Sequence, residues 1–338
     1  MRGNGITYDT GFFNGVTTTH EPFDLDAVRH DLRVIRDDLH CTAVRLTGAL
    51  PERLDLAARH AAALGLEVWF SPFTYELDQD ALLDLLLDCA NRAERLRREG
   101  ARVVLVTGAE LSLFTSGFLP GDTADARLSG LLARDPRILA GLPELPKRIN
   151  AFLRRAVEAV RTRFSGPVTY ASIHFEGVDW TPFDFAAYDV YRTKESAPHF
   201  HAGLRAMKAM GKPLAITEFG CATFHGAADM GALGADIVEY EDGHAVRLKG
   251  EYARDEAEQA RCIAELVDAF EEAGVDSAFL CTFACFYLPH RPAGGVDFDL
   301  ASLGVVKVHP PAPNRPDHSR WTPKASFNAL ADAYRSGA

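Results

Sequence analysis

The chain has 338 residues, of which 47% are hydrophobic and 25% are charged, a composition typical of a globular protein with a large core. Its 36 basic and 47 acidic residues give a formal charge of −11. This acidity argues against nucleic acid and anionic membranes as partners. No apolar run approaches the roughly 18 residues of a membrane span. Composition therefore favours an enzyme or a binding protein for small molecules, and leaves the oligomeric state open.

The cysteine pattern and the N-terminus bear on the compartment. The six cysteines lie mostly inside apolar runs and show no CxxC spacing, which predicts buried free thiols in a reducing compartment. Residues 1–5 enter a strand almost at once, leaving no room for a signal peptide. These observations predict a cytoplasmic protein.

Short apolar runs alternate with helical periodicity along the chain. The runs that predict buried parallel strands are 5–8, 43–46, 66–70, 102–107, 168–173, 185–191, 214–217 and 277–283. Helices are predicted at 24–39, before 65, and at 79–98, 146–164, 197–210, 255–273 and 325–334. Eight strands alternating with helices, without a phosphate-binding glycine motif, predict a single (β/α)8 TIM barrel over residues 1–338.

The three longest connections, 111–145, 219–254 and 287–323, follow the fourth, seventh and eighth strands. Connections that follow strands belong to the face of a barrel where active sites are built. Loops of this length are uncommon unless they are functional or disordered. We therefore expect them to meet over an enclosed pocket.

Polar side chains gather where the predicted strands end. The candidates for a site are Tyr8, Asp9, Arg45, Glu110, His174, Glu176, Tyr191, Glu218, Cys285, Tyr287 and His290, with Trp180 as a possible stacking platform. Two carboxylates, Glu110 and Glu218, suit the cleavage of a glycosidic bond, in which one protonates the leaving oxygen and the other attacks or activates water. Arg45 would keep Glu218 ionised, and Tyr191 would donate a hydrogen bond to it.

Two motifs resemble a known superfamily. Residues 216–220, Ile-Thr-Glu-Phe-Gly, resemble the strand-7 nucleophile motif of the clan A retaining glycoside hydrolases, and Val44-Arg45 resembles their strand-2 arginine. The resemblance implies that Glu110 is the acid/base and Glu218 the nucleophile, with no cofactor and no metal. Residues 108–112, 282–285 and 304–307 also look like bacterial barrel proteins labelled abortive infection proteins, a label that says little about chemistry.

Two departures from the superfamily pattern favour a small glycoside or sugar-like metabolite over a polysaccharide. Ala109 stands where the superfamily usually has an Asn that contacts the sugar 2-hydroxyl, and the run 281–283 replaces an aromatic platform on strand 8. They leave a non-catalytic carbohydrate or metabolite binder open. A Schiff-base lyase or aldolase using Lys194, just beyond the sixth strand, is a further alternative. His199 and His201 fall at a helix start, so no metal site is predicted there.

Overall fold

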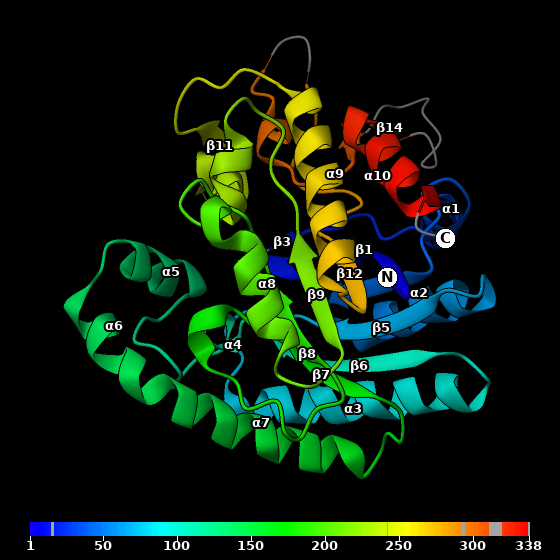
Figure 1. Ribbon diagram of the computed structural model, residues 1–338, viewed down its shortest axis with the longest axis vertical. Helices are drawn as coiled ribbons and strands as arrows, with labels where there is room; N and C mark the ends of the chain where they lie inside the picture. The colour runs from blue at the N-terminus through cyan, green and yellow to red at the C-terminus, as the bar shows by residue number, and fades with distance from the viewer. Residues whose placement is uncertain (15–16, 242, 292–294, 311–319, 337–338) are drawn as a thin grey trace.

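The computed structural model describes residues 1–14, 17–241, 243–291, 295–310 and 320–336 (Figure 1). Its central feature is a sheet of eight parallel strands in the order β7-β6-β5-β4-β1-β12-β9-β8. These strands are β1 (Gly3–Asp9), β4 (Ala43–Gly48), β5 (Glu67–Pro72), β6 (Val103–Ala109), β7 (Val168–Ala171), β8 (Ala186–Asp189), β9 (Leu214–Phe219) and β12 (Ser277–Leu280). A parallel bridge between Ser172 and Tyr188 joins the two outer strands, so the predicted (β/α)8 barrel is confirmed.

Helices follow seven of the eight barrel strands. They are α1 (Leu25–Asp37), α2 (Pro51–Ala63), α3 (Gln79–Arg98), α7 (Leu145–Arg161), α8 (Phe200–Lys208), α9 (Glu256–Ala273) and α10 (Ala325–Ser336). Between β7 and β8 the described chain has only a short turn of 3-10 helix, η2 (His174–Glu176). The alternation of strands and helices is therefore interrupted once, after β7, the fifth strand of the barrel.

Local sequence explains where these helices begin and end. The side chains of Asp24 and Asp78 each accept hydrogen bonds from two backbone N–H groups in the first turns of α1 and α3. Asp255 caps α9 in the same way through Glu258 N, and Gly274 ends that helix with a positive φ of 68°. Such caps satisfy backbone groups that the helix itself cannot pair.

Small and aromatic side chains fill the interior of the barrel. Trp69 is fully buried there, with its ring centroid 4.6 Å from Phe279 and 5.2 Å from Phe185. A Cβ at Gly5 would stand 2.4 Å from the ring of Phe279, so this strand position has room only for glycine. Because side chains alternate along each strand, the outward residues form a second layer of core against the helices.

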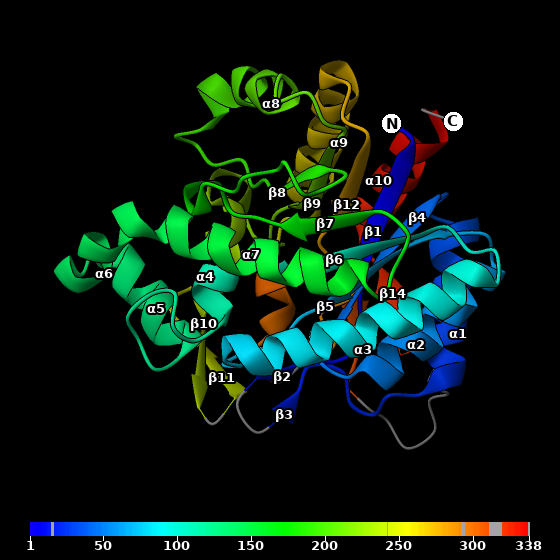
Figure 2. The ribbon, with the colours of Figure 1, turned by 90° about the horizontal axis from the view of Figure 1, so that it is seen from below.

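The long connections carry elements of their own. The stretch 111–145, expected to be irregular, instead contains α4 (Leu111–Phe114), α5 (Ala124–Leu132), α6 (Pro136–Gly141) and η1 (Leu142–Glu144). Figures 1 and 2 show α5 and α6 at one side of the molecule, beyond the start of α7. The other short elements are β2 (Phe13–Asn14), β3 (Thr17–Thr18), η3 (Ala197–His199), η4 (Ala227–Asp229), η5 (Gly231–Ile237), β10 (Val238–Glu241), β11 (His244–Leu248), η6 (Phe298–Ala301), β13 (Val306–Val308) and β14 (Trp321–Pro323). Residues 292–294 and 311–319 of the third connection lie outside the described residues.

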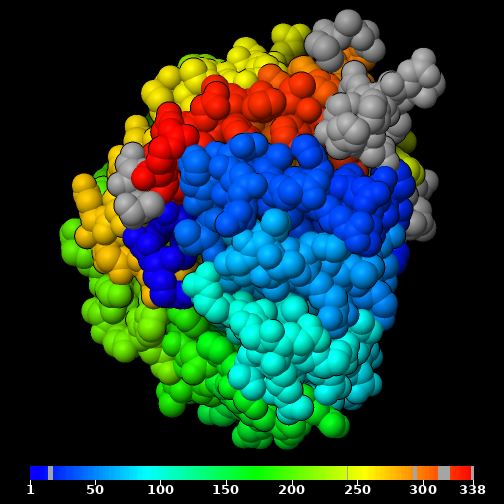
Figure 3. All heavy atoms as spheres, turned by 90° about the vertical axis from the view of Figure 1, so that its right-hand side faces the viewer, coloured from blue at the N-terminus to red at the C-terminus, as the bar shows by residue number. Residues whose placement is uncertain are grey.

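The last helix completes the ring beside the first strand. Figure 3 shows α10 bordering the N-terminal segments, and the Tyr334 hydroxyl donates a hydrogen bond to the Gly5 carbonyl at 2.8 Å. All six cysteines are free, and five of them are buried. Within the described ranges, no helix is both long enough and apolar enough to cross a membrane.

Trp69→Ala should destabilise the fold, because it empties the centre of the barrel and removes the hydrogen bond from Nε1 to Glu67. We expect a loss of about 3–5 kcal/mol in the free energy of unfolding, measured by urea denaturation. Leu132→Ala, at a residue that is 48% exposed, is the control and should change this free energy by less than about 0.5 kcal/mol. Equal effects of the two substitutions would contradict the interior packing described above.

Candidate active site

Irregular backbone at the ends of β6, β8 and β9 aims three carboxylates into the same space. Asp189 pairs with Glu218 while the preceding Tyr188 pairs with Ile216, so Thr217 is an extra residue in β9. A similar register shift interrupts β6 before Ala109. Bulges of this kind redirect side chains at barrel rims. Here the bulges turn the ends of these strands toward the barrel axis.

Glu110 follows β6 in a left-handed conformation, with φ 45° and ψ 44°. It stands at the N-cap position of α4, yet its side chain makes no capping hydrogen bond. Its backbone instead accepts hydrogen bonds from Leu113 N and Phe114 N. The carboxyl group is thus available to the site rather than used by the helix.

The carboxylates of Glu110, Asp189 and Glu218 form one cluster. Each offers an oxygen that lies within 4.8 Å of an oxygen of the other two. Glu110 and Glu218 therefore meet at the same end of the barrel, as the sequence analysis expected. Asp189 was not among the predicted site residues.

Both expected partners of Glu218 are in place. Nη1 of Arg45, a fully buried residue, donates to Glu218 Oε1 at 2.7 Å and to the Thr217 carbonyl at 3.0 Å. The Tyr191 hydroxyl donates to Glu218 Oε2 at 2.9 Å. Burial raises the pKa of Tyr191 well above its ordinary value, with the neighbouring Cys281 and Glu218 adding to the effect, so the hydroxyl keeps its proton. A cation and a donor thus stabilise the ionised form of Glu218.

The surroundings of Glu110 have the opposite effect. Burial raises the pKa of Glu110 well above its ordinary value, and the negative charges of Asp189, Glu218 and Glu176 raise it further. This shift favours the protonated form of Glu110, which a general acid requires.

Glu176 supports Glu110 from behind. It is fully buried and accepts hydrogen bonds from Ser112 N, Tyr170 Oη and Ser172 Oγ at 2.8–3.0 Å. The Tyr170 hydroxyl in turn accepts a hydrogen bond from Leu111 N at 2.8 Å. Glu176 was a candidate for the site; it does not line the pocket described below, and its oxygens accept hydrogen bonds that fix the backbone following Glu110.

A pocket opens beside Glu218 at the carboxyl ends of the strands. It has a volume of about 170 Å³ and is lined by Thr7, Asp9, Phe12, Thr47, Phe73, Tyr75, Glu218, Cys281, Thr282, Ala284, Cys285, Tyr287 and Leu303. Asp9 and Tyr287 are therefore where the sequence analysis expected them. Burial raises the pKa of Asp9 to about 6, although Thr19 and the Gly11 N–H oppose the shift.

Aromatic rings form one wall of this pocket. Phe12 lies with its ring centroid 5.0 Å from Phe73 and 5.5 Å from Tyr75, and Phe114 lies 4.9 Å from both Phe73 and Tyr75. Tyr75 interacts electrostatically with Asp125 of α5 and with Tyr240 of β10, and Tyr287 with Tyr75 and Tyr240. Of the three long connections, the third contributes Tyr287 and Leu303 to the pocket lining.

Tyr8 and Trp180 were expected in the site, but both belong to the core. Thr7 and Asp9 face the pocket, so Tyr8 between them faces outward, where its hydroxyl donates to Asp31 at 2.9 Å. Trp180 is 6% exposed and donates through Nε1 to the Tyr188 hydroxyl at 2.7 Å. Neither side chain lines the pocket.

His174 and Lys194 also lie away from the pocket. His174 begins η2, and its ring centroid is 6.0 Å from that of Tyr188. Lys194 is exposed on the connection after β8, where its backbone N–H bonds to the Asp229 carbonyl. A Schiff base at Lys194 would therefore form outside the pocket, which is against the aldolase alternative.

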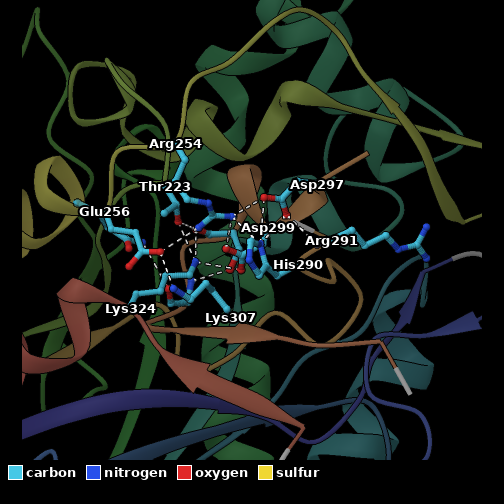
Figure 4. A network of polar contacts seen from close by, with 12 residues as sticks. Thr223, Arg254, Glu256, His290, Arg291, Asp297, Asp299, Lys307 and Lys324 are labelled. Carbon is cyan, nitrogen blue, oxygen red and sulfur yellow. Dashed lines mark hydrogen bonds and ion pairs between the residues drawn. The ribbon is translucent and has the colours of Figure 1, made fainter. Parts of the chain in front are cut away.

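His290 belongs to a charged network (Figure 4). Its Nδ1 lies 3.0 Å from Asp297, and Arg254 pairs with Asp297 at 2.7 Å and with Asp299 at 2.9 Å. The fully buried Lys324 completes the network, 3.1 Å from Asp299. His290 does not line the pocket, and its contact with Arg254 joins the connections that follow the seventh and eighth strands.

Sequence reasoning missed Asp189 and the aromatic wall. The predicted sixth strand, 185–191, ran past Asp189, which made this residue a strand interior rather than an end. The predicted third strand stopped at residue 70, before Phe73 and Tyr75. The available signal was the same for both: polar or aromatic residues at the last position of a strand, or within three positions beyond it, lie at the site face.

Two clusters among the described residues bring together groups that metal ions prefer. One is the carboxylate cluster of the site, and the other joins His225, Asp255 and Glu258. In the second, Asp255 caps α9 and Glu258 accepts hydrogen bonds from Gly226 N and Ala228 N. Capping accounts for these contacts of the second cluster without an ion.

The fold has counterparts among solved structures of glycoside hydrolases. The chain is similar to a GH113 β-1,4-mannanase, with a TM-score of 0.62 and 14% identity over 98% of each chain. It is also similar to the GH113 β-mannanase AaManA from Alicyclobacillus acidocaldarius, with a TM-score of 0.58 and 17% identity over 99% of this chain and 97% of that one. A β-glucuronidase from Parabacteroides merdae matches with a TM-score of 0.58 and 15% identity, over 98% of this chain and 37% of the enzyme.

No protein-family model matches the sequence, and a search of curated proteins finds no match. The resemblance to abortive infection proteins is accordingly not shown by these comparisons. At identities of 14–17%, the solved structures establish the architecture. The chain has the TIM-barrel fold that clan A glycoside hydrolases use.

Proposed function

We propose that this protein is a retaining glycoside hydrolase with Glu218 as nucleophile and Glu110 as acid/base. The observation that carries the proposal is the close approach of two glutamates with different neighbours. A cation and a hydrogen-bond donor contact Glu218, whereas anions surround Glu110. Arg45 and Tyr191 favour the ionised form of Glu218, whereas burial and neighbouring anions favour the protonated form of Glu110. Each glutamate brings one oxygen within 4.8 Å of an oxygen of the other, which is compatible with the roughly 5–5.5 Å separation of carboxyl groups in retaining enzymes.

The proposed reaction has two steps. In the first, a Glu218 oxygen attacks the anomeric carbon, the bond to the leaving oxygen breaks, and Glu110 gives that oxygen its proton. In the second, Glu110 takes a proton from water, the water oxygen attacks the anomeric carbon, and Glu218 leaves as a carboxylate. Arg45 and Tyr191 bind the carboxylate before attack and after release.

The pocket supports a small substrate. Its volume of about 170 Å³ is below the roughly 300–1,000 Å³ of drug-sized ligand sites. Phe12, Phe73 and Tyr75 offer ring faces on which the apolar side of a sugar can stack. Asp9 can accept hydrogen bonds from sugar hydroxyls. Since two structural neighbours are β-mannanases, β-mannosides are the first glycosides to test, followed by β-glucosides and β-glucuronides.

One observation favours a second function, the binding of a carbohydrate or metabolite without turnover. Ala109 is 3% exposed and packs in the barrel interior, so it offers no side-chain contact to a sugar 2-hydroxyl. The two functions separate on kinetics. A binder needs neither glutamate for chemistry.

Glu218→Ala should abolish turnover, because no carboxylate remains to attack. On 2,4-dinitrophenyl glycosides of mannose, glucose and glucuronic acid, we expect a loss of more than about a thousandfold in kcat. Sodium azide should restore part of the rate and yield a glycosyl azide. Lys194→Ala is the matched control and should keep wild-type kinetics. Loss of less than about tenfold in Glu218→Ala would contradict its role as nucleophile, and binding of these glycosides by the wild type without turnover would support the binding function.

Glu110→Gln should change the pH profile rather than remove all activity. The wild type should lose kcat/KM at alkaline pH as Glu110 gives up its proton, and the raised pKa of Glu110 places this loss above the ordinary range of a glutamate. The variant should lack this limb. It should lose about 10²–10⁴-fold on methyl glycosides, whose poor leaving group needs protonation, and much less on dinitrophenyl glycosides. An unchanged alkaline limb would assign that limb to another group.

A further inference from the structure

Asp189 presents an electrostatic problem that the two-glutamate reaction leaves unanswered. Both of its carboxylate oxygens are buried, and neither has a hydrogen-bond partner of normal geometry among the described residues. A buried ionised carboxylate without donors is strongly destabilised. Glu110 and Glu218 each bring a carboxylate oxygen within 4.8 Å of it, which makes ionisation more costly still.

Among the groups around Asp189, Arg45 and the Thr217 hydroxyl favour its ionised form, whereas burial and the charge of Glu218 oppose it. Glu110 faces it from the end of β6, Glu218 and Thr217 from β9, Arg45 from β4, and Tyr191 from the chain after β8. Arg45 is the one cation of this set, and its Nη1 and Nε atoms are bonded to Glu218, Thr217 and Ser71. The cluster thus has one positive charge for three carboxyl groups, and the closest contact of the guanidinium is with Glu218.

A shared proton resolves this arrangement. Glu110 and Asp189 each bring a carboxyl oxygen within 4.8 Å of the other, so a hydrogen bond can join them once one of the two carries a proton. Two ionised carboxylates cannot form that bond, because neither can donate. If one of them is protonated, it donates to the other, which removes one charge and gives Asp189 the partner that it otherwise lacks.

We propose that Asp189 is a positioning residue that shares one proton with Glu110 and so keeps Glu110 loaded as the general acid. The inference rests on the proposed function for its consequence in catalysis and on the geometry of the pair for the proton itself. Carboxyl dyads that share a proton occur where like charges are held close together, and they titrate as a pair. Burial, followed by the charge of Glu218, raises the pKa of Asp189 to about 8, in the same direction.

The shared proton also affects the second step. After Glu110 has protonated the leaving oxygen, the pair holds two negative charges side by side. Uptake of a proton from the attacking water removes one of them, so Asp189 makes Glu110 a stronger base for hydrolysis of the glycosyl-enzyme. Without Asp189, Glu110 would be a weaker base, and the covalent intermediate would persist.

The test is a direct titration that needs no substrate. Wild-type protein carrying ¹³C at the side-chain carboxyls of Asp and Glu is titrated by NMR, with Glu110→Gln and Asp189→Asn to assign the signals. We expect the wild-type pair to titrate in two separated steps, the upper one near or above neutral pH. In Asp189→Asn, the pKa of Glu110 should fall by at least about one unit, because the neighbouring like charge is gone.

Asp184→Asn is the matched control, since Asp184 is exposed just before β8, and it should leave both signals unchanged. The proposal is overturned if both wild-type carboxyls ionise independently below about pH 5, or if the pKa of Glu110 is the same in Asp189→Asn as in the wild type. It is also overturned if Mg²⁺, Ca²⁺ or Zn²⁺ alone shifts the three carboxyl signals at stoichiometric concentration, since a cation then replaces the proton.

A thermal measurement covers the case in which Asp189→Asn gives poor spectra. A group whose folded-state pKa is about 8 and whose unfolded-state pKa is about 3.9 stabilises the fold fully below the unfolded value, and this stability is lost as pH rises through about 8. The Tm of the wild type should therefore fall between pH 6 and pH 9 by more than that of Asp189→Asn. Equal falls would count against a proton held at this residue.

Kinetics then separates the two proposals. On a dinitrophenyl glycoside that the wild type accepts, Asp189→Asn should lower kcat and KM together and preserve kcat/KM, because the glycosyl-enzyme accumulates. A shared proton in the NMR titration without turnover of any glycoside would leave this inference standing and contradict the hydrolase. Turnover of a glycoside, with the same pKa for Glu110 in Asp189→Asn as in the wild type, would support the hydrolase and contradict this inference.

Discussion

The ion pair between Arg45 and Glu218 is the interaction around which the site is arranged. A guanidinium with no exposed surface requires a partner, because an unpaired buried charge is destabilised by several kcal/mol. β4 supplies the arginine and β9 the glutamate, so the pair forms only when the barrel is closed across strands that are far apart in sequence. The Thr217 carbonyl and the Ser71 hydroxyl accept further hydrogen bonds from Arg45. Site formation and barrel closure are therefore coupled.

The sequence predicted the barrel because buried parallel strands leave a strong signal. Runs such as residues 103–107 are apolar on both faces, and helices with regular apolar spacing separate them. Strand ends were predicted less well, since an apolar run does not say which residue is the last to pair. The error at the sixth strand hid Asp189, whereas the predicted seventh strand, 214–217, stopped two residues before the end of β9 and so placed Glu218 at a strand end.

The direction in which side chains point was the second feature that the sequence predicted poorly. Alternation along β1 separates Asp9, which lines the pocket, from Tyr8, which packs in the core, and the bulge at Thr217 changes that alternation locally. Residues in connections were harder still. His290 and Trp180 carry side chains suited to sugar binding, but long-range partners such as Arg254 and Tyr188 hold them elsewhere. Such partners become visible only once the chain is folded.

The backbone at position 110 has a consequence for the history of this site. A left-handed conformation is unfavourable by about 1–2 kcal/mol for residues with a Cβ atom, and glycine adopts it freely. Glu110 occupies it at φ 45° and gains no capping hydrogen bond from its side chain. A chain shaped by stability alone would place glycine at this turn. The glutamate therefore lowers the stability of the fold locally. A glycine at this position in a related sequence would indicate that the chemistry of the carboxyl group has been lost.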